Sequence, residues 1–115
     1  MYEYKAKVIS VYDGDTIRCD IDLGFDICIR YQAIRLLGID TPEIRGDERE
    51  NGLLVRDFVR EEILDKEVVL KTYKDRKGKY GRWLGEILYV KDDNTLNLCE
   101  VLLEKGYAVP YEWNR

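Results

Sequence analysis

Apolar and polar residues alternate over several short segments of this chain, as they do in strands that bury one face. The first two segments are joined through Asp13-Gly14, a dipeptide favoured in tight hairpins. Five strands are expected, at about Tyr4 to Tyr12, Thr16 to Asp22, Asp26 to Leu37, Val68 to Tyr73 and Trp83 to Val90.

Two segments have a helical spacing of apolar residues instead. The first runs from about Glu50 to Leu64, with Leu53, Leu54 and Phe58 on its apolar side and Val55, Ile63 and Leu64 as further candidates. The second runs from about Leu96 to Lys105, with Asn94 or Thr95 as the cap and Gly106 as the stop. Residues 38–49 form a polar loop between the third strand and the first helix.

Five short strands with an interposed helix predict a mainly β fold of the α+β class, a Greek-key barrel of the OB type, which often binds oligonucleotides. The chain has 115 residues, of which 45% are hydrophobic. That is enough for a single core, so we expect one domain over residues 1–115.

Three short runs hold the side chains that metal-assisted phosphodiester cleavage would use. They are Asp13-Gly14-Asp15-Thr16, Arg35-Leu36-Leu37-Gly38-Ile39-Asp40-Thr41-Pro42-Glu43 and Lys79-Tyr80-Gly81-Arg82. Hard divalent cations prefer oxygen ligands, so Asp15 and Asp40 are candidate metal ligands. Thr41 is a third candidate through its carbonyl, whose direction the following Pro42 restricts.

Glu43 follows the metal candidates and is the candidate general base, able to take a proton from an attacking water. Arg35 and Arg82 are candidate phosphate clamps, because their planar forks match phosphate geometry. Strict alternation would put Arg35 on the apolar face of its strand, with Ile27, Ile29, Tyr31, Ala33 and Leu37. A guanidinium there needs an anion, and a structural ion pair with a nearby aspartate is the competing explanation.

In this order and spacing, the three runs resemble the staphylococcal nuclease family, and the match extends from near Tyr4 to about Trp113. The resemblance implies an OB-type barrel that cleaves DNA and RNA with one calcium ion and leaves 3′-phosphates. It implies calcium ligands at Asp15, Asp40 and the Thr41 carbonyl. It implies catalytic roles for Arg35, Glu43 and Arg82, contacts of Lys79 and Tyr80 with a terminal phosphate, and packing of Tyr111 and Trp113 against the nucleotide.

The chain also departs from the family pattern. The stretch between Asp15 and Arg35 is longer, so we expect an extended second hairpin. The segment after Glu43 is shorter, and the sequence stops at Arg115, so the usual C-terminal third helix is expected to be missing.

The formal net charge is −4, which argues mildly against a nucleic-acid partner. The basic loop between Lys71 and Arg82 weakens this argument, because it concentrates positive charge in one segment. Such charge runs are, however, usually solvated turns. We expect binding that is weak without metal, and a preference for single strands, whose unstacked bases reach Tyr111 and Trp113. The protein is expected to be a monomer.

The absence of histidine excludes a Ser-His triad and a histidine-ligated zinc site. A disulfide between Cys19 and Cys28 is conceivable if the hairpin turns at Leu23-Gly24, but we favour free thiols. The first residues do not resemble a signal peptide and no segment resembles a membrane span. A cytoplasmic location is therefore expected unless a signal was removed.

Two further functions fit the same residues. One is a non-catalytic nucleic-acid-binding or scaffold module on the same barrel. The other is a plain calcium-binding or structural domain in which Asp15 and Asp40 cap turns, the usual role of Asp beside Gly. For Asp13, which precedes the glycine, we favour that turn role.

Overall fold

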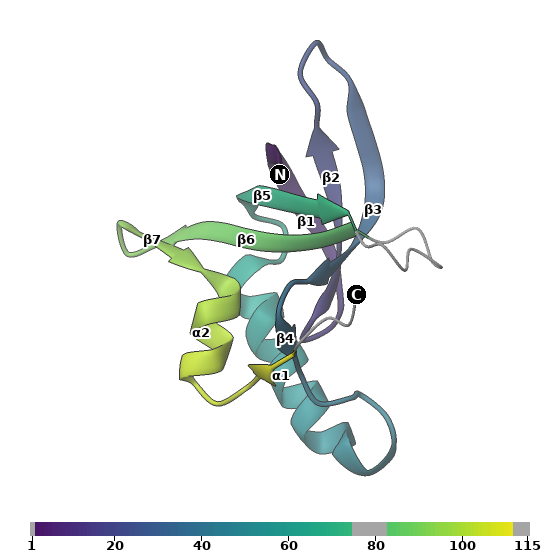
Figure 1. The fold of residues 1–115 in the computed structure, drawn as a ribbon, viewed down its shortest axis with the longest axis vertical. Coiled ribbons are helices and arrows are strands. Elements are labelled where there is room, and N and C mark those ends of the chain that lie inside the picture. The colour runs from purple at the N-terminus through teal and green to yellow at the C-terminus, as the bar shows by residue number, and fades with distance from the viewer. Residues whose placement is uncertain (1, 75–82, 112–115) are drawn as a thin grey trace.

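The computed structural model describes residues 2–74 and 83–111. Its main sheet has six strands in the order β3-β2-β1-β5-β6-β7, and β3 also pairs with β6 in parallel (Figure 1). That second pairing closes five of the strands into a ring. The ring strands are β1 (Tyr2–Asp13), β2 (Thr16–Asp22), β3 (Cys28–Leu36), β5 (Glu67–Lys74) and β6 (Trp83–Lys91).

The remaining elements lie around this barrel. β7 (Asn94–Asn97) pairs with β6, while β4 (Ile39–Asp40) and β8 (Val109–Pro110) form a separate two-stranded sheet. A 3-10 turn, η1 (Gly46–Glu48), precedes α1 (Arg49–Ile63), and α2 (Leu98–Glu104) follows β7. The mainly β, OB-type barrel with two α-helices is therefore confirmed. Neither of these helices is long and apolar enough to cross a membrane, among the residues that the structure describes.

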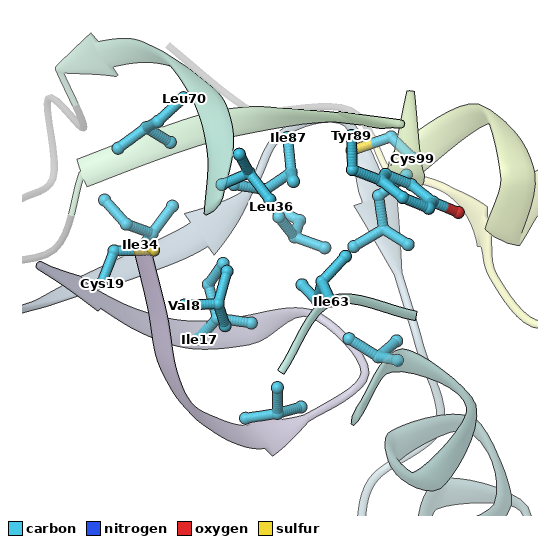
Figure 2. Close-up of a cluster of buried hydrophobic side chains, with 14 of the residues drawn as sticks. Val8, Ile17, Cys19, Ile34, Leu36, Ile63, Leu70, Ile87, Tyr89 and Cys99 are labelled. Atoms are coloured by element: carbon cyan, nitrogen blue, oxygen red, sulfur yellow. The ribbon is translucent and has the colours of Figure 1, made fainter. Parts of the chain in front are cut away.

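The core is formed by inward-facing residues of the barrel strands together with residues of α1 and α2 (Figure 2). In β1 the buried residues change from even to odd numbers, from Ala6 and Val8 to Val11. A shift in the pairing with β2 between Val8 and Ser10 causes this change, because one extra residue turns the following side chains to the other face. The shift lets one long strand supply the core at both of its ends.

The buried stripe of α1 consists of Gly52, Val55, Val59, Glu62 and Ile63. Of the predicted apolar residues, Val55 and Ile63 belong to this stripe, whereas Leu54 is exposed and Leu53, Phe58 and Leu64 are half-buried. The helix itself begins and ends within one residue of the prediction. The segment and the helical period were therefore predicted correctly, and the buried face was predicted only in part.

The N-cap candidates predicted for the second helix were wrong, whereas the predicted stop at Gly106 is confirmed by its positive φ. Asp92 and Asp93 both have positive φ, as a two-residue hairpin requires, so Asn94 and Thr95 continue the sheet as β7. The cap is Asn97, whose Oδ1 accepts a 2.9 Å hydrogen bond from the backbone N–H of Cys99.

The second hairpin is long and extends past the other strands, at the top of Figure 1. Its loop is wider than the predicted Leu23-Gly24 turn, because Leu23 N–H bonds Ile27 O and Ile27 N–H bonds Gly24 O. This width sets the pairing of Cys19 with Gln32 and of Cys28 with Asp22. The two cysteines are thus not opposite each other, and both are free thiols.

Candidate functional site

The turn between β1 and β2 meets the loop after β4 at the edge of the barrel. Asp13 pairs with Thr16, so the turn residues are Gly14 and Asp15, one position later than predicted. Asp15 is only 5% exposed, and its Oδ2 accepts a 3.0 Å hydrogen bond from the backbone N–H of Thr41. Its carbonyl accepts a 2.8 Å bond from Leu36 N–H. These bonds hold three separate chain segments around the Asp15 carboxylate.

Gly14 is required by the close approach of these segments. A Cβ at this position would lie 2.7 Å from Val55 Cγ1 and 2.8 Å from Thr41 Oγ1. Among the described residues, that buried hydroxyl has no hydrogen-bond partner. The side chain of Thr41 therefore packs towards Gly14, while its backbone N–H bonds Asp15.

Arg35 lies between the two candidate metal ligands. Its side chain makes ion pairs with Asp15 Oδ2 at 3.3 Å and with Asp40 Oδ1 at 3.4 Å. Nη1 also donates to the carbonyls of Leu36 and Ile39, at 3.1 and 3.0 Å. Four oxygen partners fix the plane of the guanidinium, and the residue is only 8% exposed.

The predicted face of Arg35 was wrong, although the need for an anion was right. The fully buried residues of β3 are Ile34 and Leu36, while Ile27, Ile29 and Tyr31 are exposed on the projecting hairpin. Alternation fails because the pairing of β2 with β3 shifts between Cys19 and Ile21. Arg35 therefore points away from the barrel core and is covered by neighbouring loops.

The site carries more acidic than basic groups among the described residues. Burial raises the pKa of the Asp40 carboxyl, and the charge of Asp15 raises it further, against the opposing charge of Arg35. Burial, with the hydrogen bond and charge of Asp15, raises the pKa of Asp13 to about 7. The Asp13 carboxylate also accepts a 3.1 Å bond from Asp15 N–H, the contact of an Asx-turn, which confirms its predicted turn role.

This donor set fits a hard cation. Asp15 and Asp40 offer carboxylate oxygens, and both flank one guanidinium that does not neutralise them fully. Within residues 2–74 and 83–111, no three side chains of His, Cys, Asp or Glu gather closely enough to hold a metal alone. Two carboxylates would therefore need a backbone oxygen and water to complete the six to eight ligands usual for calcium.

Glu43 lies next to this cluster, on the loop between β4 and η1. Its side chain is exposed, and its charge contributes to the raised pKa of Asp40. The peptide of Glu43 packs directly on α1, where a Cβ on Gly52 would lie 2.0 Å from the Glu43 carbonyl oxygen. Only glycine allows the loop this close to the helix.

A second contact joins the same loop to β1. The guanidinium of Arg45 donates a 2.6 Å hydrogen bond to the Tyr12 hydroxyl. Sequence reasoning missed Tyr12, Arg45 and Gly52, because their roles depend on how loop and helix meet. The helical position of Gly52, where glycine is unfavourable, was the one signal that pointed to a close approach.

The described part of the site is completed by Tyr111, which is partly exposed. Its backbone N–H donates a 2.9 Å bond to Gly38 O, and the Arg35 guanidinium lies 5.8 Å from its ring centre. The structure therefore brings together Asp15, Arg35, Asp40, Thr41, Glu43 and Tyr111. Four other predicted residues lie outside the described residues, namely Lys79, Tyr80, Arg82 and Trp113.

Known proteins are similar to this chain over most of its length. A family model described as staphylococcal nuclease homologue matches residues 33–115. An uncharacterized protein of Methanocaldococcus jannaschii is 31% identical over 129 residues, which cover 94% of this chain and 59% of that protein.

Two thermonucleases are also similar. That of Staphylococcus hyicus is 35% identical over 95 residues, 76% of this chain and 53% of that protein. That of Staphylococcus intermedius is 33% identical over 87 residues, 69% of this chain and 48% of that protein. The chain thus spans between 48% and 59% of the length of these curated relatives.

Proposed function

Because this chain belongs to the staphylococcal nuclease homologue family, we propose that it is a calcium-dependent nuclease that hydrolyses phosphodiester bonds of DNA and RNA. The products would carry 3′-phosphates. Residues 1–115 would act as one nuclease domain and as a monomer. The observation that carries the proposal is the packing of the Arg35 guanidinium between the carboxylates of Asp15 and Asp40.

The carboxylates of Asp15 and Asp40 and the carbonyl of Thr41 would hold the calcium ion. Bound there, the ion would withdraw charge from a phosphate oxygen and acidify a water. The protein's part would be to hold both carboxylates near one place. The hydrogen bond from Thr41 N–H to Asp15 and the ion pairs of Arg35 with both aspartates support this, because they restrain the two side chains.

Glu43 would act as the general base. A base needs a carboxylate that water and substrate can reach, and Glu43 is exposed beside a largely buried cluster. The carboxylate would take the proton of the attacking water as the oxygen approaches phosphorus. Packing of its peptide on Gly52 would hold the loop so that the carboxylate stays within reach of that water.

Arg35 and Arg82 would bind the phosphate and offset the charge that develops in the transition state. The Arg35 fork is fixed by carbonyl oxygens on one edge, so little reordering accompanies binding. A buried arginine paired with two aspartates can be purely structural. Burial and the charge of Asp15 raise the pKa of Asp40 more than the charge of Arg35 lowers it, so the guanidinium does not fully offset the two aspartates, which leaves a role for a cation.

Lys79, Tyr80, Tyr111 and Trp113 would contact the substrate. Tyr111 supports this role because its ring is partly exposed beside Arg35. Stacking on such rings is sequence-tolerant and favours single strands.

The alternative is a non-catalytic nucleic-acid-binding or scaffold module. One experiment separates the two functions, namely cleavage of a labelled single-stranded oligonucleotide with calcium, with magnesium and with chelator. We expect calcium-dependent cleavage that falls at least about a hundredfold in Glu43→Gln. Glu61→Gln is the matched control, because it removes an exposed carboxylate on α1 away from the site.

The same experiment can contradict the proposed function in two ways. A wild-type protein that binds the oligonucleotide but cuts it with neither metal would support the binding module. Equal turnover in Glu43→Gln and wild type would remove Glu43 from the role of base.

A further inference from the structure

The outward face of the β2–β3 hairpin continues directly from the candidate site. Thr16 pairs with Arg35, and the next pair on the same face joins Arg18 to Ala33. Side chains that share a face recur every two residues, so this second pair lies about 7 Å further along the hairpin. A nucleic-acid strand bound at Arg35 can therefore run along this face of the hairpin.

Tyr31 is held on this face by an unusual backbone. Its φ is 57°, a left-handed conformation that is uncommon for an aromatic residue. Its N–H donates to Asp20 Oδ1 at 2.9 Å and its carbonyl accepts from Arg18 Nη1 at 3.0 Å. Two side chains thus satisfy the peptide groups of a bulge, a feature that commonly redirects a side chain near a binding site.

The bulge places an aromatic ring beside a cation. The Arg18 guanidinium carbon lies 4.8 Å from the Tyr31 ring centre, and Tyr31 remains 51% exposed. Arg18 is also exposed, and a guanidinium has N–H groups to spare after its bond to one carbonyl. Arg30, paired with Asp20 at 3.7 Å, extends outward from the same bulge.

We propose that Arg18 and Tyr31 form an additional subsite for single-stranded nucleic acid, one nucleotide or more away from the phosphate at Arg35. The base stacks on the exposed ring of Tyr31, and the guanidinium of Arg18 pairs with the neighbouring phosphate. This subsite rests on the proposed nuclease function. Charge complementarity and continuity with Arg35 favour a nucleic-acid strand as the occupant of this face.

The test compares substrates with and without a nucleotide that reaches the subsite. Cleavage is measured on a single-stranded oligonucleotide of about twelve nucleotides and on a dinucleotide with one phosphodiester bond. Tyr31→Gly removes the ring and suits the positive φ, so the bulge is retained. Phe25→Gly is the matched control, because it removes another exposed aromatic, also at positive φ, from the hairpin loop.

Tyr31→Gly is expected to raise KM for the oligonucleotide about tenfold and to leave dinucleotide cleavage within about twofold. Arg18→Gln is expected to act similarly, while Tyr31→Phe and Phe25→Gly keep wild-type values. Wild-type KM for the oligonucleotide in Tyr31→Gly would overturn the subsite. An equal loss on both substrates would also overturn it, since a general structural defect would explain that result.

Two further measurements separate the subsite from the rest of the proposal. If the wild type cuts neither substrate, the nuclease function fails, and fluorescence anisotropy of the labelled oligonucleotide decides the subsite. Tenfold weaker binding in Tyr31→Gly would then support it, and unchanged binding would overturn it. A wild-type dimer that dissociates in Tyr31→Gly, seen by sedimentation, would assign this face to a second copy of the chain and overturn the proposal.

Discussion

The backbone N–H of Thr41 donates a 3.0 Å hydrogen bond to Asp15 Oδ2, although the two residues are 26 positions apart in the sequence. This bond fixes one carboxylate oxygen and leaves the loop that carries Asp40 and Glu43 tied to the β1–β2 turn. The geometry of the candidate metal site therefore depends on a contact between two loops, and disturbing either loop should affect the other.

Calcium binding is the first property to test. Asp40→Asn is expected to weaken calcium binding at least about tenfold, because an amide is a poorer ligand than a carboxylate and carries no charge. Isothermal titration calorimetry gives the dissociation constant. Asp47→Asn is the control, since Asp47 is an exposed acid on η1. An unchanged dissociation constant in Asp40→Asn would refute the metal assignment.

The planar geometry of the Arg35 guanidinium can be tested with a lysine at this position. Arg35→Lys keeps the charge but cannot bond two carboxylates and two carbonyls at once. We expect kcat to fall at least about a hundredfold, together with a loss of about 1–3 kcal/mol in the free energy of unfolding.

Arg60→Lys is the matched control, because Arg60 donates from two nitrogens to the Val11 carbonyl, away from the site. It is expected to lower stability and to leave kcat unchanged. If Arg35→Lys is destabilised to a similar degree but keeps near-wild-type kcat, Arg35 is a structural partner.

Much of the fold could be predicted because barrel strands have a period of two. The bounds of β2 agree with the prediction at both ends, and those of β6 differ by one residue. The wrong predictions arise where the pairing of neighbouring strands shifts or turns. Neither the bulge at Tyr31 nor the hairpin at Asp92 and Asp93 has a glycine at its positive φ, so the sequence lacks the usual signal for either.

The candidate site could be predicted as a set of residue types but not as a contact network. Asp15, Arg35 and Asp40 are recognisable because their chemistry suits a metal and a phosphate. Asp13 received only a turn role, because nothing in the sequence shows that its carboxyl is buried against Asp15. Gly52 was missed because the need for glycine comes from the Glu43 peptide, which packs on it in three dimensions.

Gly52 should therefore control both stability and turnover. Gly52→Ala adds a Cβ that would lie 2.0 Å from the Glu43 carbonyl oxygen, so helix and loop must separate. We expect a net loss of about 1–3 kcal/mol in stability, despite the better helix propensity of alanine. We also expect lower kcat, because the loop that carries Glu43 must move away from the helix.

Urea unfolding and steady-state kinetics measure these two effects. Asn51→Ala, at the neighbouring exposed position of α1, is the control and should keep wild-type kcat. Wild-type kcat in Gly52→Ala would show that packing at this point does not position Glu43.

The buried carboxylate of Glu62 should make stability depend on pH. Its oxygens accept hydrogen bonds from Tyr89 Oη at 2.7 Å and from Lys91 Nζ at 2.5 Å. Burial alone would raise the pKa of Glu62, but these two partners outweigh it and hold the pKa below its ordinary value of 4.5. The stabilisation is therefore full above pH 4.5 and is lost as the pH falls through the lower folded value.

Glu62→Gln is accordingly expected to lower the free energy of unfolding at pH 7 by about 1–3 kcal/mol and to lose less stability than wild type on acidification. Denaturant unfolding between pH 7 and pH 3 measures both effects. Asp57→Asn is the control, because its ion pair with Arg56 is exposed and should contribute little. Parallel pH profiles for Glu62→Gln and wild type would contradict the assignment, because they would mean that Glu62 binds protons equally in the folded and unfolded states.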